Sequence, residues 1–134
     1  MIVIAVLLVV LSYFSLTKGY EVFGIKISSI KQIEENIPNA ILNGDRENRL
    51  AGNANFSFKG IDAGQLLLKL DESGICASAG SACSTGEALP SHVLTAIGLD
   101  SNLAKSALRV SFGRENTLED VDFLVNKIKE FIKK

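Results

Sequence analysis

The chain has 134 residues, enough for one compact domain but few for a two-lobed enzyme that depends on a cofactor. Its 14 basic and 15 acidic residues nearly balance, which leaves no net field to attract nucleic acid or an anionic membrane surface. One histidine, and two cysteines that are neither closely spaced nor numerous, predict no bound metal and no secreted disulfide scaffold. A reducing compartment fits this cysteine content best.

The stretch from Met1 to Leu16 is almost wholly apolar, whereas the chain after Lys18 has the composition of a soluble protein. Its length lies between that of a buried core segment and the roughly 20 residues that span a bilayer. It lacks the basic start and the small-residue cleavage site of a secretory signal. Two interpretations are open. One is a membrane-associated or spanning helix, and the other is an apolar helix from the core of a larger protein or from a displaced start site. We therefore separate residues 1–27 from a domain over residues 28–134.

The first part of this domain alternates helix and strand patterns. Ser28 to Asn36 has isoleucines at helical spacing, and the proline that follows ends the element. Asn43 to Asn53, rich in Asn, Gly and charge, predicts a surface loop. Alternating polar and aromatic side chains predict a half-buried strand from Asn55 to Phe58. Asp62 is then placed to cap a helix that ends at Leu70.

The second part contains one unusual segment. The apolar residues Gly74 to Ala77 predict a brief buried strand. The next residues, Ser78 to Gly86 (SAGSACSTG), have only small side chains that neither fill a core nor fix a regular element. We expect a loop there with a mobile backbone and accessible side chains. Beyond it, the pattern predicts a helix from Ser91 to Ile97, ended by Gly98, and a strand from Ala107 to Phe112.

The last residues have the pattern of a long amphipathic helix. Thr117 is placed to cap its start, and two terminal lysines suit its C-terminal end. Its apolar stripe comprises Leu118, Val121, Leu124, Val125, Ile128 and Ile132. Together the elements predict an α+β domain in which helices pack on a short antiparallel or mixed sheet.

The two cysteines receive different interpretations. In its loop of Gly, Ser and Ala, Cys83 is unhindered, and an accessible sulfur can meet a substrate and then a second acceptor. No histidine stands beside it, so thiolate formation would depend on a helix N-terminus, loop amides or a partner, and an inert buried thiol is the alternative. Cys76 lies in the apolar stretch and is expected to face the core. The alternative for Cys76 is a resolving thiol that forms a disulfide with Cys83.

Arg109 lies in the middle of a predicted strand, where its guanidinium must either emerge on the polar face or be paired. From there it can form a two-pronged bond to a substrate carboxylate. The alternative is an ordinary solvated or salt-bridged strand residue. His92, a single histidine with no visible carboxylate partner, is given no role.

Several sequence blocks match one known family in order and spacing. The blocks are Asn43–Asp45, Gly52–Phe58, Gly74–Ser84, Pro90–Leu94 and Leu108–Gly113. They resemble the C-terminal part of cysteine desulfurases of the NifS/IscS type, within the class-V aminotransferase group. The resemblance runs from about Glu34 to the end of the chain, and its most specific piece is Ser78 to Ser84, which is similar to the active-site cysteine loop of that family.

This resemblance implies the small C-terminal domain of a fold-type I pyridoxal-phosphate enzyme, with an added apolar N-terminal helix. Such an enzyme takes sulfur from L-cysteine and releases alanine, usually as a cytoplasmic homodimer, for iron-sulfur cluster or thiocofactor assembly. By position, Cys83 would be the nucleophile that becomes a persulfide and passes sulfur to an acceptor protein. Arg109 would bind the α-carboxylate of the substrate.

The resemblance also implies what to expect outside this segment. In the family, the cofactor lysine and the phosphate-binding groups lie in a large upstream domain, and here the only histidine is followed by Val93 rather than by lysine. We expect no cofactor-binding residue in this chain, and we expect that the chain alone neither binds pyridoxal phosphate nor releases sulfide. One alternative is a non-catalytic sulfur-relay or binding module that uses Cys83, tethered to a membrane if Met1 to Leu16 inserts. Another is a nonfunctional remnant.

Overall fold

A three-stranded antiparallel sheet forms the middle of the molecule. The computed structural model describes residues 24, 26–79 and 89–133. The strands β1 (Ala40–Leu42), β2 (Asn53–Phe58) and β3 (Ala107–Ser111) lie in the order β1-β2-β3. In the centre of β2, Phe56 faces Leu42 on one neighbouring strand and Leu108 on the other. The predicted strands at 55–58 and 107–112 are therefore confirmed as the two long strands of the sheet.

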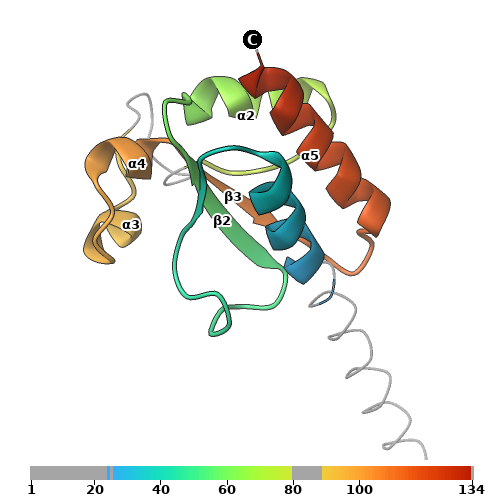
Figure 1. Cartoon of the computed structure of the whole chain (residues 1–134), viewed down its shortest axis with the longest axis horizontal. Helices are drawn as coiled ribbons and strands as arrows, with labels where there is room; N and C mark the ends of the chain where they lie inside the picture. The colour runs from blue at the N-terminus through green and yellow to red at the C-terminus, as the bar shows by residue number, and fades with distance from the viewer. Residues whose placement is uncertain (1–23, 25, 80–88, 134) are drawn as a thin grey trace, which may run out of the picture.

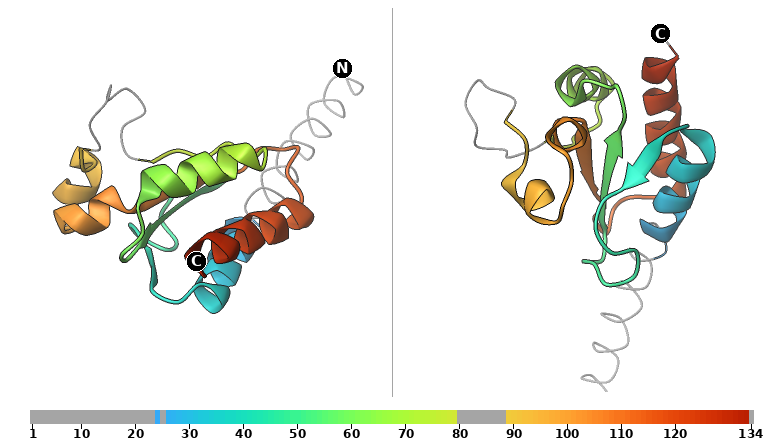
Figure 2. Two further views of the ribbon diagram at one scale, coloured as in Figure 1. Left: turned by 90° about the horizontal axis from the view of Figure 1, so that it is seen from above. Right: turned by 60° about the vertical axis from the view of Figure 1, so that its left-hand side comes forward.

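Helices lie on both sides of this sheet. The helix over residues 26–36, α2 (Ala63–Glu72) and α5 (Leu118–Ile132) pack against one face. The two short helices α3 (His92–Ala96) and α4 (Ser101–Lys105) lie on the other side of β2 (Figure 1). The right-hand view of Figure 2 shows α3 and α4 to the left of β2, with α5 and residues 26–36 to the right. The α+β architecture expected from the sequence is confirmed.

The main core lies between the sheet and its three covering helices. Alternate residues of β2 and β3 point into it, because side chains on a strand alternate between the two faces. Its buried members are Ile30, Ile33, Ile37, Ala54, Phe56, Phe58, Leu66, Leu70, Leu108, Val110, Val121, Leu124, Val125 and Ile128. A smaller cluster of Leu94, Ala104 and Ala107 joins α3 and α4 to the opposite face. Within the described residues, this small cluster covers only part of that opposite face.

The predicted helix starts are confirmed by their caps. Asp62 accepts a hydrogen bond from the backbone N–H of Gln65 at the start of α2, at 3.0 Å. At the start of α5, Thr117 and Asp120 form a reciprocal capping box. The apolar stripe predicted for α5 is correct in its middle, but Leu118 in the first turn is 55% exposed because it lies beyond the edge of the core.

The segment after α2 differs from the prediction of a buried strand. Gly74 has φ of 78°, and the N–H of Ile75 bonds back to the carbonyl of Leu70 at 2.9 Å, which closes the helix in a Schellman motif. The next three residues, 75–77, have no strand partner among the described residues, and the first pairing is the isolated bridge at Ser78. Ile75 packs on the core, so the next side chain, that of Cys76, points away from it and is exposed. The predicted packing role of Cys76 is therefore wrong.

Two elements were not predicted. The strand β1 is too short to show a pattern, and α4 has only five residues. The loop predicted from Asn43 to Asn53 overlaps β2 by one residue, because β2 begins at Asn53. The helices predicted at 28–36 and 91–97 are confirmed, and Gly98, with φ of 94°, ends α3.

Two parts of the sequence analysis fall outside the described residues. These are the apolar segment Met1 to Leu16 and most of the small-residue loop, including Cys83. The added apolar helix and the accessible thiol therefore stay predictions. Among the helices in the described part of the chain, none is long and apolar enough to cross a membrane.

Candidate functional site

Four polar residues form one row across the sheet, on the face that points away from the main core. Asn43 bonds through its N–H to the carbonyl of Asn55 at 2.9 Å, and Asn55 lies opposite Arg109 in the register of β2 and β3. On its other side, Arg109 exchanges two backbone bonds with Ser78, at 2.7 and 3.0 Å. Asn43, Asn55, Arg109 and Ser78, in that order, are called the cross-strand row below.

Arg109 emerges on the open part of this face. Its neighbours in β3, Leu108 and Val110, are buried in the main core, whereas Arg109 is exposed. Of the two options in the sequence analysis, emergence on the polar face is the correct one. No salt bridge to Arg109 exists among the residues that the structure describes, so the guanidinium is available to an anionic ligand.

Asn55 is the direct cross-strand neighbour of Arg109 on β2. The backbone N–H and C=O of Arg109 both point to Ser78, so Asn55 and Arg109 face each other as a non-hydrogen-bonded pair. Such pairs have Cα atoms about 4.5 Å apart and bring their side chains together on one face. The amide and the guanidinium therefore share one patch of the surface.

A hydrogen-bond relay holds the Asn55 amide in place. The Nδ2 group of Asn43 donates to Asn55 Oδ1 at 2.7 Å and to Ser57 Oγ at 2.9 Å. Ser57 in turn donates to the carbonyl oxygen of Leu103 in α4, at 2.8 Å. Ser57 is fully buried because α4 covers the sheet there, so the strand predicted to be half-buried is covered on both faces at this point.

The loop after β1 holds the backbone of Asn43 through a hydrogen bond from Arg49. Arg49 donates through Nη2 to the Asn43 carbonyl and through Nε to the Asp45 carbonyl, the latter at 2.6 Å. Burial lowers the pKa of Arg49 from its ordinary value, while the nearby Asp45 carboxylate opposes this shift. Hydrogen bonds from the N–H groups of Asn48 and Glu47 hold the pKa of Asp45 below its usual range. The loop is thus internally bonded and fixes one end of the relay.

Sequence reasoning identified Arg109, but it missed the neighbouring Asn55 and the two residues that hold it, Asn43 and Ser57. Their grouping depends on strand register, which the isolated patterns do not give. The one available signal was the alternation of polar and aromatic residues that places Asn55 and Ser57 on the same face. His92, to which no role was given, is exposed at the first position of α3.

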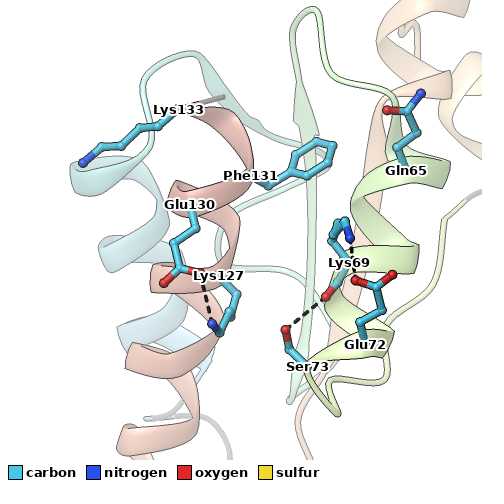
Figure 3. Close-up of a pocket in the computed structure, with 8 residues that line it drawn as sticks. All are labelled: Gln65, Lys69, Glu72, Ser73, Lys127, Glu130, Phe131 and Lys133. Carbon is cyan, nitrogen blue, oxygen red and sulfur yellow. Dashed lines mark hydrogen bonds and ion pairs between the residues drawn. The ribbon is translucent and has the colours of Figure 1, made fainter.

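A separate groove of about 690 Å³ lies between α2 and α5. Figure 3 shows Phe131 pointing into it from α5, with Lys69 and Glu72 on the facing helix. Four of its five charged side chains form ion pairs, at 2.5 Å for Lys69 with Glu72 and 3.0 Å for Lys127 with Glu130, and the fifth is Lys133. Because both helices cover the face of the sheet opposite to Arg109, this groove is distinct from the cross-strand row.

The cross-strand row lies within a recognised domain. The model of the family described as aminotransferase class-V matches residues 25–124. The chain belongs to the class-V aminotransferase family. Pyridoxal phosphate is the cofactor of that family.

Relatives within the family agree with the cysteine desulfurase resemblance. Cysteine desulfurase IscS of Clostridium botulinum is 47% identical over 106 residues, which cover 78% of this chain and 27% of that protein. Cysteine desulfurase IscS of Methanosarcina thermophila is 46% identical over 98 residues, covering 73% of this chain and 24% of the relative. The chain thus spans about a quarter of the length of these curated relatives.

The fold also has solved counterparts. The crystal structure of a NifS-like protein from Rickettsia africae superimposes with a TM-score of 0.74, covering 87% of this chain and 29% of that chain at 24% sequence identity. This likeness shows that the fold of this family member is that of a segment of a NifS-like protein.

Proposed function

We propose that this segment performs the sulfur-accepting part of cysteine desulfuration. In this reaction the Cβ–S bond of L-cysteine breaks and the sulfur bonds to Cys83 Sγ. The products are alanine and a persulfide on Cys83, so a thiol and L-cysteine are converted with no external oxidant or reductant. Relatives named cysteine desulfurase, at up to 47% identity, support the reaction class.

The position of Ser78 beside Arg109 is the observation that carries this proposal. The two reciprocal backbone bonds of Ser78 attach the start of the small-residue loop to the middle of β3. Cys83 follows Ser78 by five residues, and five residues of extended chain span at most about 18 Å. The chain itself therefore limits the distance between the proposed nucleophile and the proposed carboxylate ligand.

Arg109 is proposed to bind the α-carboxylate of L-cysteine. A guanidinium offers parallel N–H donors that match the two oxygens of a carboxylate. Its exposure leaves it accessible to a ligand that arrives from the open side of the sheet. Binding the carboxylate there would orient the substrate so that its sulfur is presented to the loop.

The described residues beside Arg109 do not form a pyridoxal-phosphate site by themselves. Asn43, Asn55 and Ser57 carry amides and a hydroxyl, which can neither form an imine with the cofactor nor act as the anion that pairs a pyridinium nitrogen. We propose that chain outside this segment supplies the cofactor, as expected from the sequence, and that activity needs both parts. The homodimer and the sulfur-acceptor protein implied by the family are proposals of the same kind.

The test supplies the missing part in trans. The full chain is mixed with pyridoxal phosphate and with the remainder of the C. botulinum relative, which lacks the 106 matched residues. We expect L-cysteine to produce alanine and a mass increase of one sulfur on the peptide that contains Cys83. Cys83→Ser should abolish both products, whereas Cys76→Ser should not. Sulfur found on Cys76 alone would contradict the proposal.

The relay-module hypothesis predicts a different result in the same assay. If Cys83 accepts sulfur only from another protein, a persulfide donor will modify it without the cofactor-bearing remainder and without L-cysteine. Alanine would then not appear in the reconstituted mixture under any condition. Alanine formation that depends on both Cys83 and Arg109 would exclude this alternative.

A further inference from the structure

We propose that Asn55 is a second ligand for the α-carboxylate of the amino acid, and that Asn43 and Ser57 are positioning residues that aim its amide. This inference rests on the proposed function, because it extends the carboxylate site of Arg109. Asn55 would donate one hydrogen bond through Nδ2 to the carboxylate that Arg109 binds. Specificity for an α-carboxylate would then depend on the sheet face as a whole and not on one side chain.

The direction of the relay follows from the Leu103 carbonyl. A carbonyl oxygen only accepts hydrogen bonds, so the single hydroxyl hydrogen of Ser57 must point to it. Ser57 can therefore only accept from Asn43, which requires the Nδ2 side of the Asn43 amide to face Ser57 and Asn55. The atom of Asn55 that meets this group must be its acceptor, Oδ1.

Because Asn55 Oδ1 accepts a hydrogen bond from Asn43, the two N–H donors of Asn55 Nδ2 point away from Asn43. In the described part of the chain, no hydrogen bond uses Asn55 Nδ2. Asn55 is only partly buried and lies on the same face as Arg109, its direct cross-strand neighbour. The fixed relay thus presents a donor beside the guanidinium.

This arrangement suits an anion with several acceptor sites. A carboxylate has two oxygens and about four lone-pair positions, so two donor groups can share it without competing. A neutral amide also adds a donor without adding a second positive charge that would repel Arg109. If the relay were only a structural tie between β1 and β2, its direction would not matter to ligand binding.

The full chain alone permits a direct test by nitrogen-15 NMR. L-Alanine, the proposed product, is titrated against the side-chain signals of Asn55 and Arg109, with alanine methyl ester as the probe without a carboxylate. We expect both signals to shift with alanine and neither with the ester. A shift at Arg109 without a shift at Asn55 would refute the inference and leave the proposed function intact. No shift at either residue would refute the carboxylate site altogether.

Matched variants separate a donor from a general charge effect. Asn55→Asp keeps the acceptor for Asn43 and removes the outward donor, so the dissociation constant for alanine, read at Arg109, should rise about 10- to 100-fold. Asn53→Asp places the same charge two residues away on the same strand face and should change it about threefold or less. Equal effects of the two variants would show that the donor has no role.

Ser57→Ala tests the positioning role. It removes the group that fixes the direction of the Asn43 amide but leaves Arg109 and Asn55 in place. We expect weaker alanine binding and an altered Asn55 amide signal before any ligand is added. Unchanged alanine binding in a folded Ser57→Ala chain would contradict the positioning role.

Discussion

One residue at the start of α5, Asp120, makes the free energy of unfolding depend on pH in the acid range. Asp120 accepts hydrogen bonds from the Thr117 N–H at 2.8 Å and from Asn116 Nδ2 at 3.3 Å, which hold the pKa of its carboxyl below the ordinary value. A carboxyl with a lowered folded-state pKa adds stability above its unfolded value and loses it as the pH falls through the folded value. Asp120→Asn should therefore reduce stability near pH 6 but much less in strong acid.

Urea unfolding of the wild type and the Asp120→Asn variant, at about pH 6 and about pH 2.5, measures this difference. The gap between the two unfolding midpoints should narrow in acid. Asp122→Asn is a suitable control, because Asp122 is exposed on the same helix and has no hydrogen bond in the described part of the chain. A gap that stays constant with pH would show that the Asp120 carboxylate does not stabilise the cap.

The helix α2 offers a matched comparison at the scale of one element. Leu66 is fully buried in the main core, whereas Leu68 on the same helix is 66% exposed. Leu66→Ala should lower the free energy of unfolding by about 2 to 5 kcal/mol, because it removes buried methyl groups and leaves a cavity. Leu68→Ala should change it by less than about 0.5 kcal/mol. Urea unfolding at neutral pH gives both values, and similar losses for the two variants would contradict the packing of α2 on the sheet.

The sequence was most informative for elements with strong local signals. The caps Asp62 and Thr117 and the stripe of α5 predicted their helices, because these signals depend on neighbouring residues alone. The brief strand predicted at Gly74 to Ala77 is wrong, because the capping of α2 by Gly74 leaves the next residues without a strand partner. The apolar residues Ile75 and Ala77 do pack on the core, as predicted for this stretch, but the side chain of Cys76 between them is exposed. The alternative role of Cys76, a disulfide with Cys83, stays a prediction, because Cys83 lies outside the described residues.

At the scale of the whole molecule, the candidate site was only partly predictable. The strand pattern gave emergence on the polar face as one of two options for Arg109, and the resemblance gave it a role. The row that joins it to Asn43, Asn55 and Ser78 arises from pairing between segments up to 66 residues apart, since Asn43 and Arg109 meet through β2. Local patterns do not fix such a register, which depends on how all the strands assemble.

The two cores of the molecule should also differ in local stability. β2 is paired on both sides and contributes Phe56 and Phe58 to the main core, whereas α3 buries only Leu94 in the small cluster. Segments with few buried contacts open at lower free energy than central strands. In hydrogen-exchange NMR of the full chain, the N–H of Phe56 should therefore exchange far more slowly than the N–H of Thr95 in α3.

The N–H of Ile128 in α5 is the matched helical control for Thr95, since it belongs to a helix that packs on the main core. Equal protection of Thr95 and Ile128 would show that α3 unfolds together with the main core. Faster exchange of Thr95 than of Ile128 would mean that α3 opens separately from the main core. The hydrogen bond from Ser57 to the Leu103 carbonyl of α4 would then join the buried relay to the less stable of the two cores.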